Sequence, residues 1–177
     1  MEKISSDKKN QNIILTGFMG TGKTTVGRLL ATTLGYQFVD TDQLIEAKSD
    51  KTIPQIFSED GEPHFRDLER QVALELSARS RLVVSTGGGM LMNEVVADTF
   101  AKTGAIFCLV ASPQEILRRV TENGPAHDRP LLAGDDPAGK IEALLNARRD
   151  RYGRFTQIQT DSLSPQDVVH SIVEQLS

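Results

Sequence analysis

A glycine-rich segment near the start of the chain restricts the fold more than any other feature. Residues 17–24 read GFMGTGKT and fit the phosphate-loop pattern G-x-x-x-x-G-K-[ST]. The apolar run Ile13–Leu15 precedes this segment, and residues 24–34 follow it with apolar side chains at helical spacing, up to a terminating Gly35. A strand, a glycine-rich turn and a helix in this order predict the first unit of a parallel α/β sheet that binds phosphate groups.

The rest of the chain repeats this alternation of strand and helix. Further strands are expected at 36–39, 82–85 and 105–110 and, more weakly, at 156–159. The helices are expected at 42–48, at 53–79 with interruptions near Pro54 and at 61–63, and at 93–101, 113–120, 137–151 and 165–176. This pattern predicts a single α/β domain over residues 1–177, with a five-stranded, mainly parallel sheet between two layers of helices. Residues 122–136 combine prolines, glycines and charges, so we expect a mobile loop there.

Composition excludes several classes of function. The 177 residues carry a formal net charge of −4, which does not suit a nucleic-acid binder. The single cysteine, Cys108, lies in an apolar run and cannot form an internal disulfide. The first ten residues are polar, unlike a signal peptide, and no apolar run approaches the roughly 18 residues that span a bilayer. These features together predict a cytoplasmic protein without nucleic-acid or membrane partners. Because no apolar stripe suits an interface, we also expect a monomer.

The phosphate-loop pattern assigns chemical roles to its residues. Its glycines let the backbone curl until successive N–H groups point at phosphate oxygens. Lys23 is expected to reach the β- and γ-phosphates, and the Thr24 hydroxyl is expected to ligate Mg²⁺. The residues expected to bind nucleotide here are Gly20, Thr21, Gly22, Lys23, Thr24 and Thr25. The pattern predicts a magnesium nucleotide but leaves the acceptor open, because kinases, switch proteins and motors all use it.

Two carboxylates follow the second expected strand. In an extended chain, residues two apart face the same way, so Asp40 and Asp42 would point into one crevice at the edge of the sheet. One would hold Mg²⁺ through water, and the other would accept a proton or a hydrogen bond from a substrate hydroxyl. The alternative is that an aspartate caps the following helix, a role that Thr41 could fill equally well.

Three consecutive glycines, Gly87, Gly88 and Gly89, follow the strand that ends at Ser85. Glycines are useful where a ligand must approach the backbone closely, and a flexible loop is the alternative. No aspartate follows this strand, where nucleotide-binding proteins of this type usually place a second metal-binding carboxylate. Asp40 is therefore the carboxylate that we expect nearest to the metal.

Three arginines lie in positions that suit an anionic substrate. Arg66 lies at the start of a helix, Arg129 in the expected mobile loop, and Arg148 late in a helix. Guanidinium groups bind carboxylates through paired hydrogen bonds, and phosphoryl transfer needs a cation near the γ-phosphate. For each arginine taken singly, a solvated surface position is the alternative.

Together these segments resemble the shikimate kinase family over residues 12–175. The resemblance is carried by GFMGTGKTTVGRLLA at 17–31, DTDQLIE at 40–46, IPQIFSEDGEPHFRDLE at 53–69, STGGG at 85–89, RPLL at 129–132 and RRDRY at 148–152. This combination, in this order and spacing, is far more specific than the phosphate loop alone. It implies a core, a shikimate-binding region near 41–70 and a lid around 122–136.

The resemblance also implies an activity and a set of site residues. The family uses ATP and Mg²⁺ to phosphorylate the 3-hydroxyl of shikimate, on the route to chorismate and the aromatic amino acids. By motif position, Lys23, Asp42 and Arg129 would be catalytic, and Thr24 and Asp40 would serve Mg²⁺. Shikimate would contact Asp42, Arg66, Gly87, Gly88, Gly89 and Arg148. ATP would also contact Arg129. Either Arg118 or Arg119 would cover the adenine, and Arg119 is the favoured one of the two. The adenine loop near 162–165 is not assigned.

Two other functions compete with this interpretation. A kinase for another hydroxylated acid, such as gluconate, would share the phosphate loop, but the arginines and the triple glycine favour shikimate. A nucleotide-switched binding protein would show no turnover that depends on an acceptor, and the D-x-D pair with its arginines argues against it.

Overall fold

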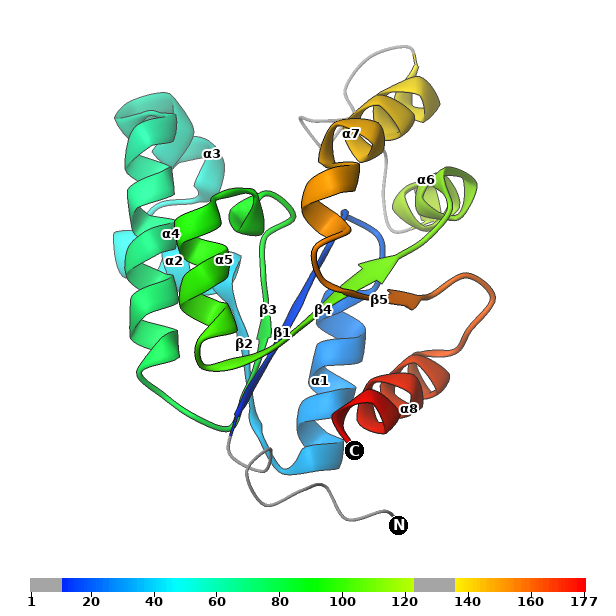
Figure 1. Cartoon of the computed structure of the whole chain (residues 1–177). Helices are drawn as coiled ribbons and strands as arrows, with labels where there is room; N and C mark the ends of the chain where they lie inside the picture. Colours follow the sequence, from blue (N-terminus) through cyan, green and yellow to red (C-terminus); the bar gives the residue numbers. More distant parts are fainter. Residues whose placement is uncertain (1–10, 123–135) are drawn as a thin grey trace.

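The computed structural model describes residues 11–122 and 136–177. Its centre is a five-stranded sheet in the order β2-β3-β1-β4-β5, in which every neighbouring pair is parallel (Figure 1). The strands are β1 (Asn12–Gly17), β2 (Gln37–Asp40), β3 (Leu82–Ser85), β4 (Gly104–Val110) and β5 (Thr156–Gln159). The predicted α/β class and the five parallel strands are confirmed, with β5 at an edge.

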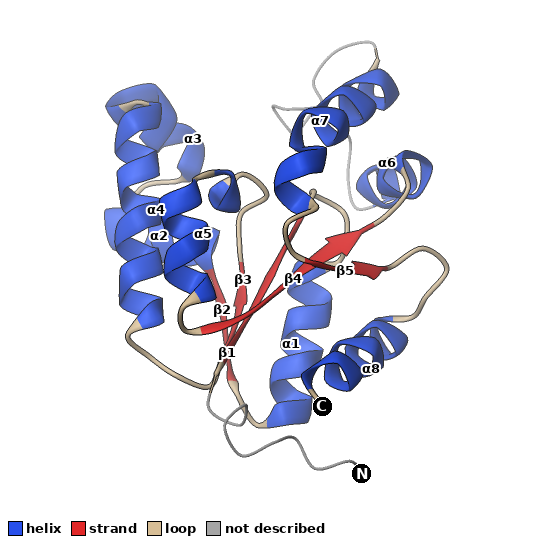
Figure 2. Cartoon of the chain, viewed as in Figure 1, coloured by secondary structure: helices blue, strands red, loops and turns tan. Residues whose placement is uncertain are grey.

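Helices cover both faces of this sheet and produce three layers (Figure 2). Strand β1 shows how the sequence does this, because its apolar side chains alternate between the two faces. Ile13 and Leu15 pack with the helices of one face, and Ile14 packs with those of the other. The first face is covered by α1 (Lys23–Leu34) and α8 (Pro165–Leu176), and the second by α2 (Thr41–Ser49), α4 (Glu62–Ser77) and α5 (Glu94–Ala101).

A third apolar cluster joins the phosphate-loop segment to two further helices, α6 (Pro113–Glu122) and α7 (Pro137–Tyr152). Phe18 of the loop and Cys108 of β4 are both buried in it. Burial raises the pKa of Cys108 to about 12, which keeps it a neutral thiol, as expected for a structural cysteine. The cluster therefore holds α6 and α7 beside the phosphate loop.

The expected helix at 53–79 is divided into three pieces. Thr52 and Gln55 form reciprocal capping hydrogen bonds at the start of the short α3 (Ile53–Gln55), so Pro54 begins a helix rather than interrupting one. A wide helical turn, η1 (Ile56–Asp60), follows and ends at Gly61, whose φ of 85° is a left-handed conformation. α4 then starts directly after Gly61 and carries Arg66 toward the site.

Most of the expected lid lies outside the described residues. Only its two ends are described: Glu122 ends α6, and the side chain of Asp136 caps α7 by accepting a hydrogen bond from the Gly139 N–H at 2.8 Å. Among the described helices, none has both the length and the apolar character needed to cross a membrane.

Candidate active site

The predicted phosphate loop joins β1 to α1 in a curled conformation. Gly17, Gly20 and Gly22 have φ values of 131°, 77° and 95°, which disfavour any residue with a side chain. At Gly17 a Cβ would also lie 2.2 Å from the carbonyl oxygen of Leu109 on β4. The loop leads directly into the first turn of α1. The N–H groups of that turn have no helical partners and can bind an anion.

Lys23 lies over this loop with its ammonium group turned inward. Its Nζ donates hydrogen bonds to the carbonyl oxygens of Gly17 and Phe18, both at 2.8 Å. Burial lowers the pKa of Lys23 to about 8, and the carboxylate of Asp42 opposes this effect. The lysine is therefore a half-buried cation at the position expected for the β- and γ-phosphates.

Asp40 caps a helix and also contacts Thr24. Its Oδ1 accepts hydrogen bonds from the N–H groups of Asp42 and Gln43, at 3.1 and 3.4 Å, so it is the N-cap of α2. Its Oδ2 accepts a hydrogen bond from the Thr24 hydroxyl at 3.3 Å. The idea that Thr41 caps this helix and leaves both aspartates free is wrong. A carboxylate has enough lone pairs to cap a helix and still face Thr24.

A divalent cation beside Thr24 and Asp40 would meet a hydroxyl and a carboxylate oxygen. These are hard oxygen donors that suit Mg²⁺, which normally keeps water and phosphate oxygens as its other ligands. Within 11–122 and 136–177, no three or more His, Cys, Asp or Glu side chains are grouped so that they could hold a metal ion. The donor set therefore fits a metal that arrives with the nucleotide.

Asp42 lies in the first turn of α2, so the expectation of an extended segment at 40–42 is wrong. Both carboxylates line the same cavity nevertheless, because α2 begins where β2 ends. Burial raises the pKa of Asp42 to about 6, the charge of Asp40 adds to this rise, and Lys23 opposes it. A carboxylate that titrates near neutral pH is suited to accept a proton from a hydroxyl.

The glycines of 87–89 lie where three functional side chains converge. A Cβ on the first glycine would lie 2.6 Å from Oδ1 of Asp42. A Cβ on the second would lie 3.6 Å from Nη1 of Arg148, and one on the third 3.6 Å from Nη1 of Arg66. The absence of a side chain at Gly87 thus allows the carboxylate of Asp42 to approach the backbone, whereas the two guanidinium groups lie at ordinary contact distance from Gly88 and Gly89.

Arg66 is held in this orientation by two glutamates. Its guanidinium donates to Oε1 of Glu62 at 3.0 and 3.1 Å and to Oε2 of Glu69 at 2.8 Å. Glu69 is buried, which raises the pKa of its carboxyl, and Arg66 opposes this rise. The two glutamates hold the Arg66 side chain along α4, with its Nη1 close to the triple glycine.

Arg148 lies between the triple glycine and the phosphate loop. Its Nη1 donates to the carbonyl oxygen of Gly88 at 3.3 Å, and its guanidinium lies 5.6 Å from the ring centroid of Phe18. The arginine is thus half-buried against these two segments, and its role in binding a substrate stays a prediction.

A cavity of about 690 Å³ opens over these elements. One side is formed by the phosphate loop with Asp40, Asp42 and Gly88, and the other by Thr160–Pro165, the segment that follows β5. Arg66, Gly89 and Arg148 are not among its lining residues, so they lie beyond its edge on the Gly88 side. The volume is in the range of small-ligand sites, and it lies at the carboxyl edge of the sheet, as expected.

Comparisons with known proteins agree with this geometry. Residues 19–177 match the family model for shikimate kinase. The shikimate kinase of Symbiobacterium thermophilum is 43% identical over 167 residues, 93% of this chain and 95% of its own length. The structure of Acinetobacter baumannii shikimate kinase in complex with shikimate superposes with a TM-score of 0.86 at 35% identity and covers 98% of this chain and 97% of its own. This chain belongs to the shikimate kinase family. It is therefore an ATP-dependent kinase whose acceptor is shikimate.

A more distant likeness shows the fold alone. A gluconokinase from Sinorhizobium meliloti has a TM-score of 0.58 at 17% identity and covers 94% of this chain and 91% of its own. The three-layer arrangement is therefore shared with other phosphate-loop kinases.

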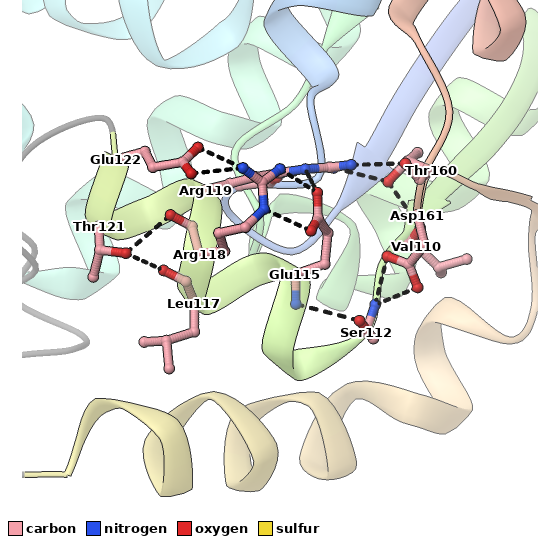
Figure 3. A network of polar contacts seen from close by, with 11 residues as sticks. Val110, Ser112, Glu115, Leu117, Arg118, Arg119, Thr121, Glu122, Thr160 and Asp161 are labelled. Atoms are coloured by element: carbon pink, nitrogen blue, oxygen red, sulfur yellow. Dashed lines mark hydrogen bonds and ion pairs between the residues drawn. The ribbon is translucent and has the colours of Figure 1, made fainter.

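In this shikimate kinase family member, the paired arginines of α6 differ in their surroundings (Figure 3). Arg119 is half-buried and donates to Glu115, to the side chain and carbonyl oxygen of Thr160, and to the carbonyl oxygen of Gly20. Arg118 is more exposed and lies between Glu115 and Glu122. Both line the cavity. Arg119 thus ties the phosphate loop to the segment after β5, and the assignment of an arginine to the adenine stays a prediction.

Several residues around Arg119 were not predicted from the sequence. Glu115 and Thr160 hold Arg119, and both oxygens of Asp161 accept hydrogen bonds from the Ser112 N–H at 3.0 Å (Figure 3). No motif marks Thr160 and Asp161, because their partners lie on elements that are distant in sequence, whereas Glu115 precedes Arg119 by four residues on the same helix. Arg129, predicted to be catalytic, lies outside the described residues, so its role stays a prediction.

Proposed function

We propose that the chain transfers the γ-phosphoryl group of ATP to the 3-hydroxyl of shikimate, giving shikimate 3-phosphate and ADP, with Mg²⁺ as the metal. The observation that supports this assignment best is the convergence of Asp42, Arg66 and Arg148 on residues 87–89, beside the phosphate loop. Two guanidinium groups suit a ring carboxylate, and a carboxylate near them suits the ring hydroxyls.

The phosphate loop would hold the nucleotide in this reaction. The N–H groups of Gly20–Thr25 and the ammonium of Lys23 would bind the phosphates. Thr24 and Asp40 would hold Mg²⁺, which supplies charge stabilisation to the phosphates when it is bound. Arg119 would remain near the adenine side, where it already contacts Thr160.

The acceptor side would be formed by Asp42, Arg66, Arg148 and residues 87–89. The hydroxyl oxygen would bond to the γ-phosphorus as the bond from that phosphorus to the bridging oxygen of ADP breaks. The proton of the hydroxyl would pass to Asp42, whose pKa of about 6 allows it to accept and then release a proton. Lys23, together with Arg129, would stabilise the charge on the transferring group.

Several features remain part of the proposal. We infer a single domain with a shikimate-binding region near 41–70, and the lid expected around 122–136 stays a prediction because most of it lies outside the described residues. The monomeric state and the cytoplasmic location stay predictions from the sequence.

A coupled assay of ADP release with a panel of acceptors tests the proposed reaction. With Mg²⁺ and ATP, shikimate should stimulate ADP release about 100-fold more than gluconate does, because buried polar groups discriminate strongly against an acceptor that leaves them unpaired. A preferred acceptor other than shikimate would overturn the substrate assignment. ADP release that no acceptor stimulates would favour the nucleotide-switched binding protein instead.

Conservative replacement of the two converging arginines tests the acceptor site. Arg66→Lys and Arg148→Lys should each raise the KM for shikimate about 10- to 100-fold, because lysine keeps the charge but loses the planar pair of donors. The KM for ATP should stay within about twofold, since neither side chain lines the nucleotide cavity. Steady-state kinetics with each substrate varied in turn measure both values.

Arg70→Lys is the matched control for these variants. Arg70 lies on the same helix as Arg66 but pairs with Asp67 at the surface, so the substitution should leave both KM values unchanged. If Arg66→Lys and Arg148→Lys behave like this control, neither arginine binds the substrate.

A further inference from the structure

Tyr152, the last residue of α7, makes a contact that the roles above do not use. Its side chain is buried, and its Oη donates a hydrogen bond to the carbonyl oxygen of Gly88 at 2.7 Å. Arg148, one helical turn earlier, donates to the same oxygen at 3.3 Å. α7 also contacts η2 (Met90–Met92), which follows the triple glycine (Figure 1). Two side chains of one helix therefore hold the middle residue of the triple glycine.

A different helix holds the preceding residue. The N–H of Gly87 donates to Oγ1 of Thr41 at 3.1 Å, and Thr41 is completely buried at the start of α2. Three consecutive glycines sample many backbone conformations when nothing restrains them. The hydroxyls of Thr41 and Tyr152 act on adjacent residues and belong to separately packed helices, so together they select one conformation of this segment.

The hydrogen bond from Tyr152 also sets the direction of the next N–H group. In a trans peptide the C=O and the N–H point to opposite sides, so a Gly88 carbonyl held by the tyrosine turns the N–H of Gly89 away from it. In the part of the chain that the structure describes, the N–H groups of Gly88 and Gly89 have no hydrogen-bond partner. The Gly89 backbone lies beside the guanidinium of Arg66, where a ligand oxygen would find it.

We propose that Tyr152 is a positioning residue for the acceptor: its hydroxyl fixes the Gly88–Gly89 peptide so that the backbone donors and Arg148 meet shikimate in one arrangement. This inference rests on the proposed binding of shikimate at residues 87–89. Burial raises the pKa of Tyr152, so the hydroxyl keeps its proton and remains a donor at neutral pH. A phenylalanine would fill the same space without the donor.

Tyr152→Phe tests this role by separating the two substrates. The KM for shikimate should rise about 3- to 10-fold, the effect of one lost neutral hydrogen bond, while the KM for ATP stays within about twofold. ADP release without an acceptor should not change. If Tyr152 had only a structural role, its replacement would instead lower the thermal midpoint of unfolding and the fraction of active protein. Both KM values would then be unaltered.

Tyr36→Phe is the matched control, because Tyr36 is the only other tyrosine of the chain and lies under Arg81, before β2. It should leave both KM values unchanged. Thr41→Val is a second test, since it removes the acceptor of the Gly87 N–H and should also raise the KM for shikimate selectively.

The outcomes separate this inference from the proposed function. Wild-type protein that does not phosphorylate shikimate would refute the function itself. If the wild type is active, then an unchanged KM for shikimate in Tyr152→Phe, an equal rise in both KM values, or a variant that does not fold would each overturn the positioning role. In wild-type protein labelled with ¹⁵N-glycine, shikimate alone should shift the amide signals of Gly88 and Gly89, and unshifted signals would also contradict it.

Discussion

Replacing Asp42 by asparagine should lower kcat about 100- to 10 000-fold, the contribution of a general base, while ATP binding stays near the wild-type value. The carboxylate lies where a substrate hydroxyl would be placed and makes no capping contact, which Asp40 supplies instead. Asparagine keeps the size and the polarity of the side chain but does not accept the proton. Steady-state turnover and calorimetric ATP binding measure the two effects separately.

The same substitution should stabilise the ligand-free protein. The pKa of Asp42 is raised from 3.8 to about 6, so the stability that this group contributes is fully present below about pH 4 and is lost as the pH rises through 6. Asparagine avoids this loss, and the free energy of unfolding at pH 8 should rise by up to about 3 kcal/mol. Urea unfolding at pH 8 and pH 4 measures the gain, which should nearly vanish at the lower pH.

Asp50→Asn is the matched control for Asp42→Asn. Asp50 follows the same helix at its other end, with a left-handed φ of 53° that asparagine tolerates, and it does not line the cavity. Its turnover should equal that of the wild type. If Asp42→Asn retains turnover within about tenfold of wild type, below the lower end of a general base's contribution, Asp42 is not the base.

Lys23→Met should lower kcat about 100- to 1000-fold, because it removes a preorganised cation from the position of the transferring phosphate. Lys23 is half-buried and donates hydrogen bonds to two carbonyl oxygens of the loop, which orient its side chain. Methionine has a similar length and no charge. The loss should exceed any change in the KM for shikimate, which steady-state kinetics show directly.

Lys48→Met is the control for the loss of a lysine charge. Lys48 pairs with Glu75 at the surface at 2.7 Å, outside the cavity, and its replacement should leave kcat unchanged. A Lys23→Met enzyme with nearly normal kcat would remove this lysine from the chemical step.

The local pattern of the sequence was enough to predict the elements and the edge of the sheet where the site lies. The apolar run of β1, the loop at 17–24 and the helix-ending Gly35 act over a few neighbours, so they can be recognised from the sequence alone. The parallel orientation of the strands follows from the alternation of strand and helix. Each helix returns the chain to the edge of the sheet where the preceding strand began, so the next strand runs in the same direction. The resemblance to shikimate kinases added the candidate site residues.

Only the tertiary structure decided which contacts the site residues make with distant parts of the chain. Asp40 both caps α2 and faces Thr24, Arg119 bridges Gly20 and Thr160, and Tyr152 holds Gly88. The bridges made by Arg119 and Tyr152 join residues 41 to 99 positions apart, and no periodicity of the sequence encodes them. A hydrogen bond depends on the positions of two atoms in space, whereas hydrophobic spacing reports only which face of an element is buried. The sequence by itself therefore determined the sheet and its phosphate loop, and the packing of distant helices brought Asp42, Arg66 and Arg148 together at residues 87–89.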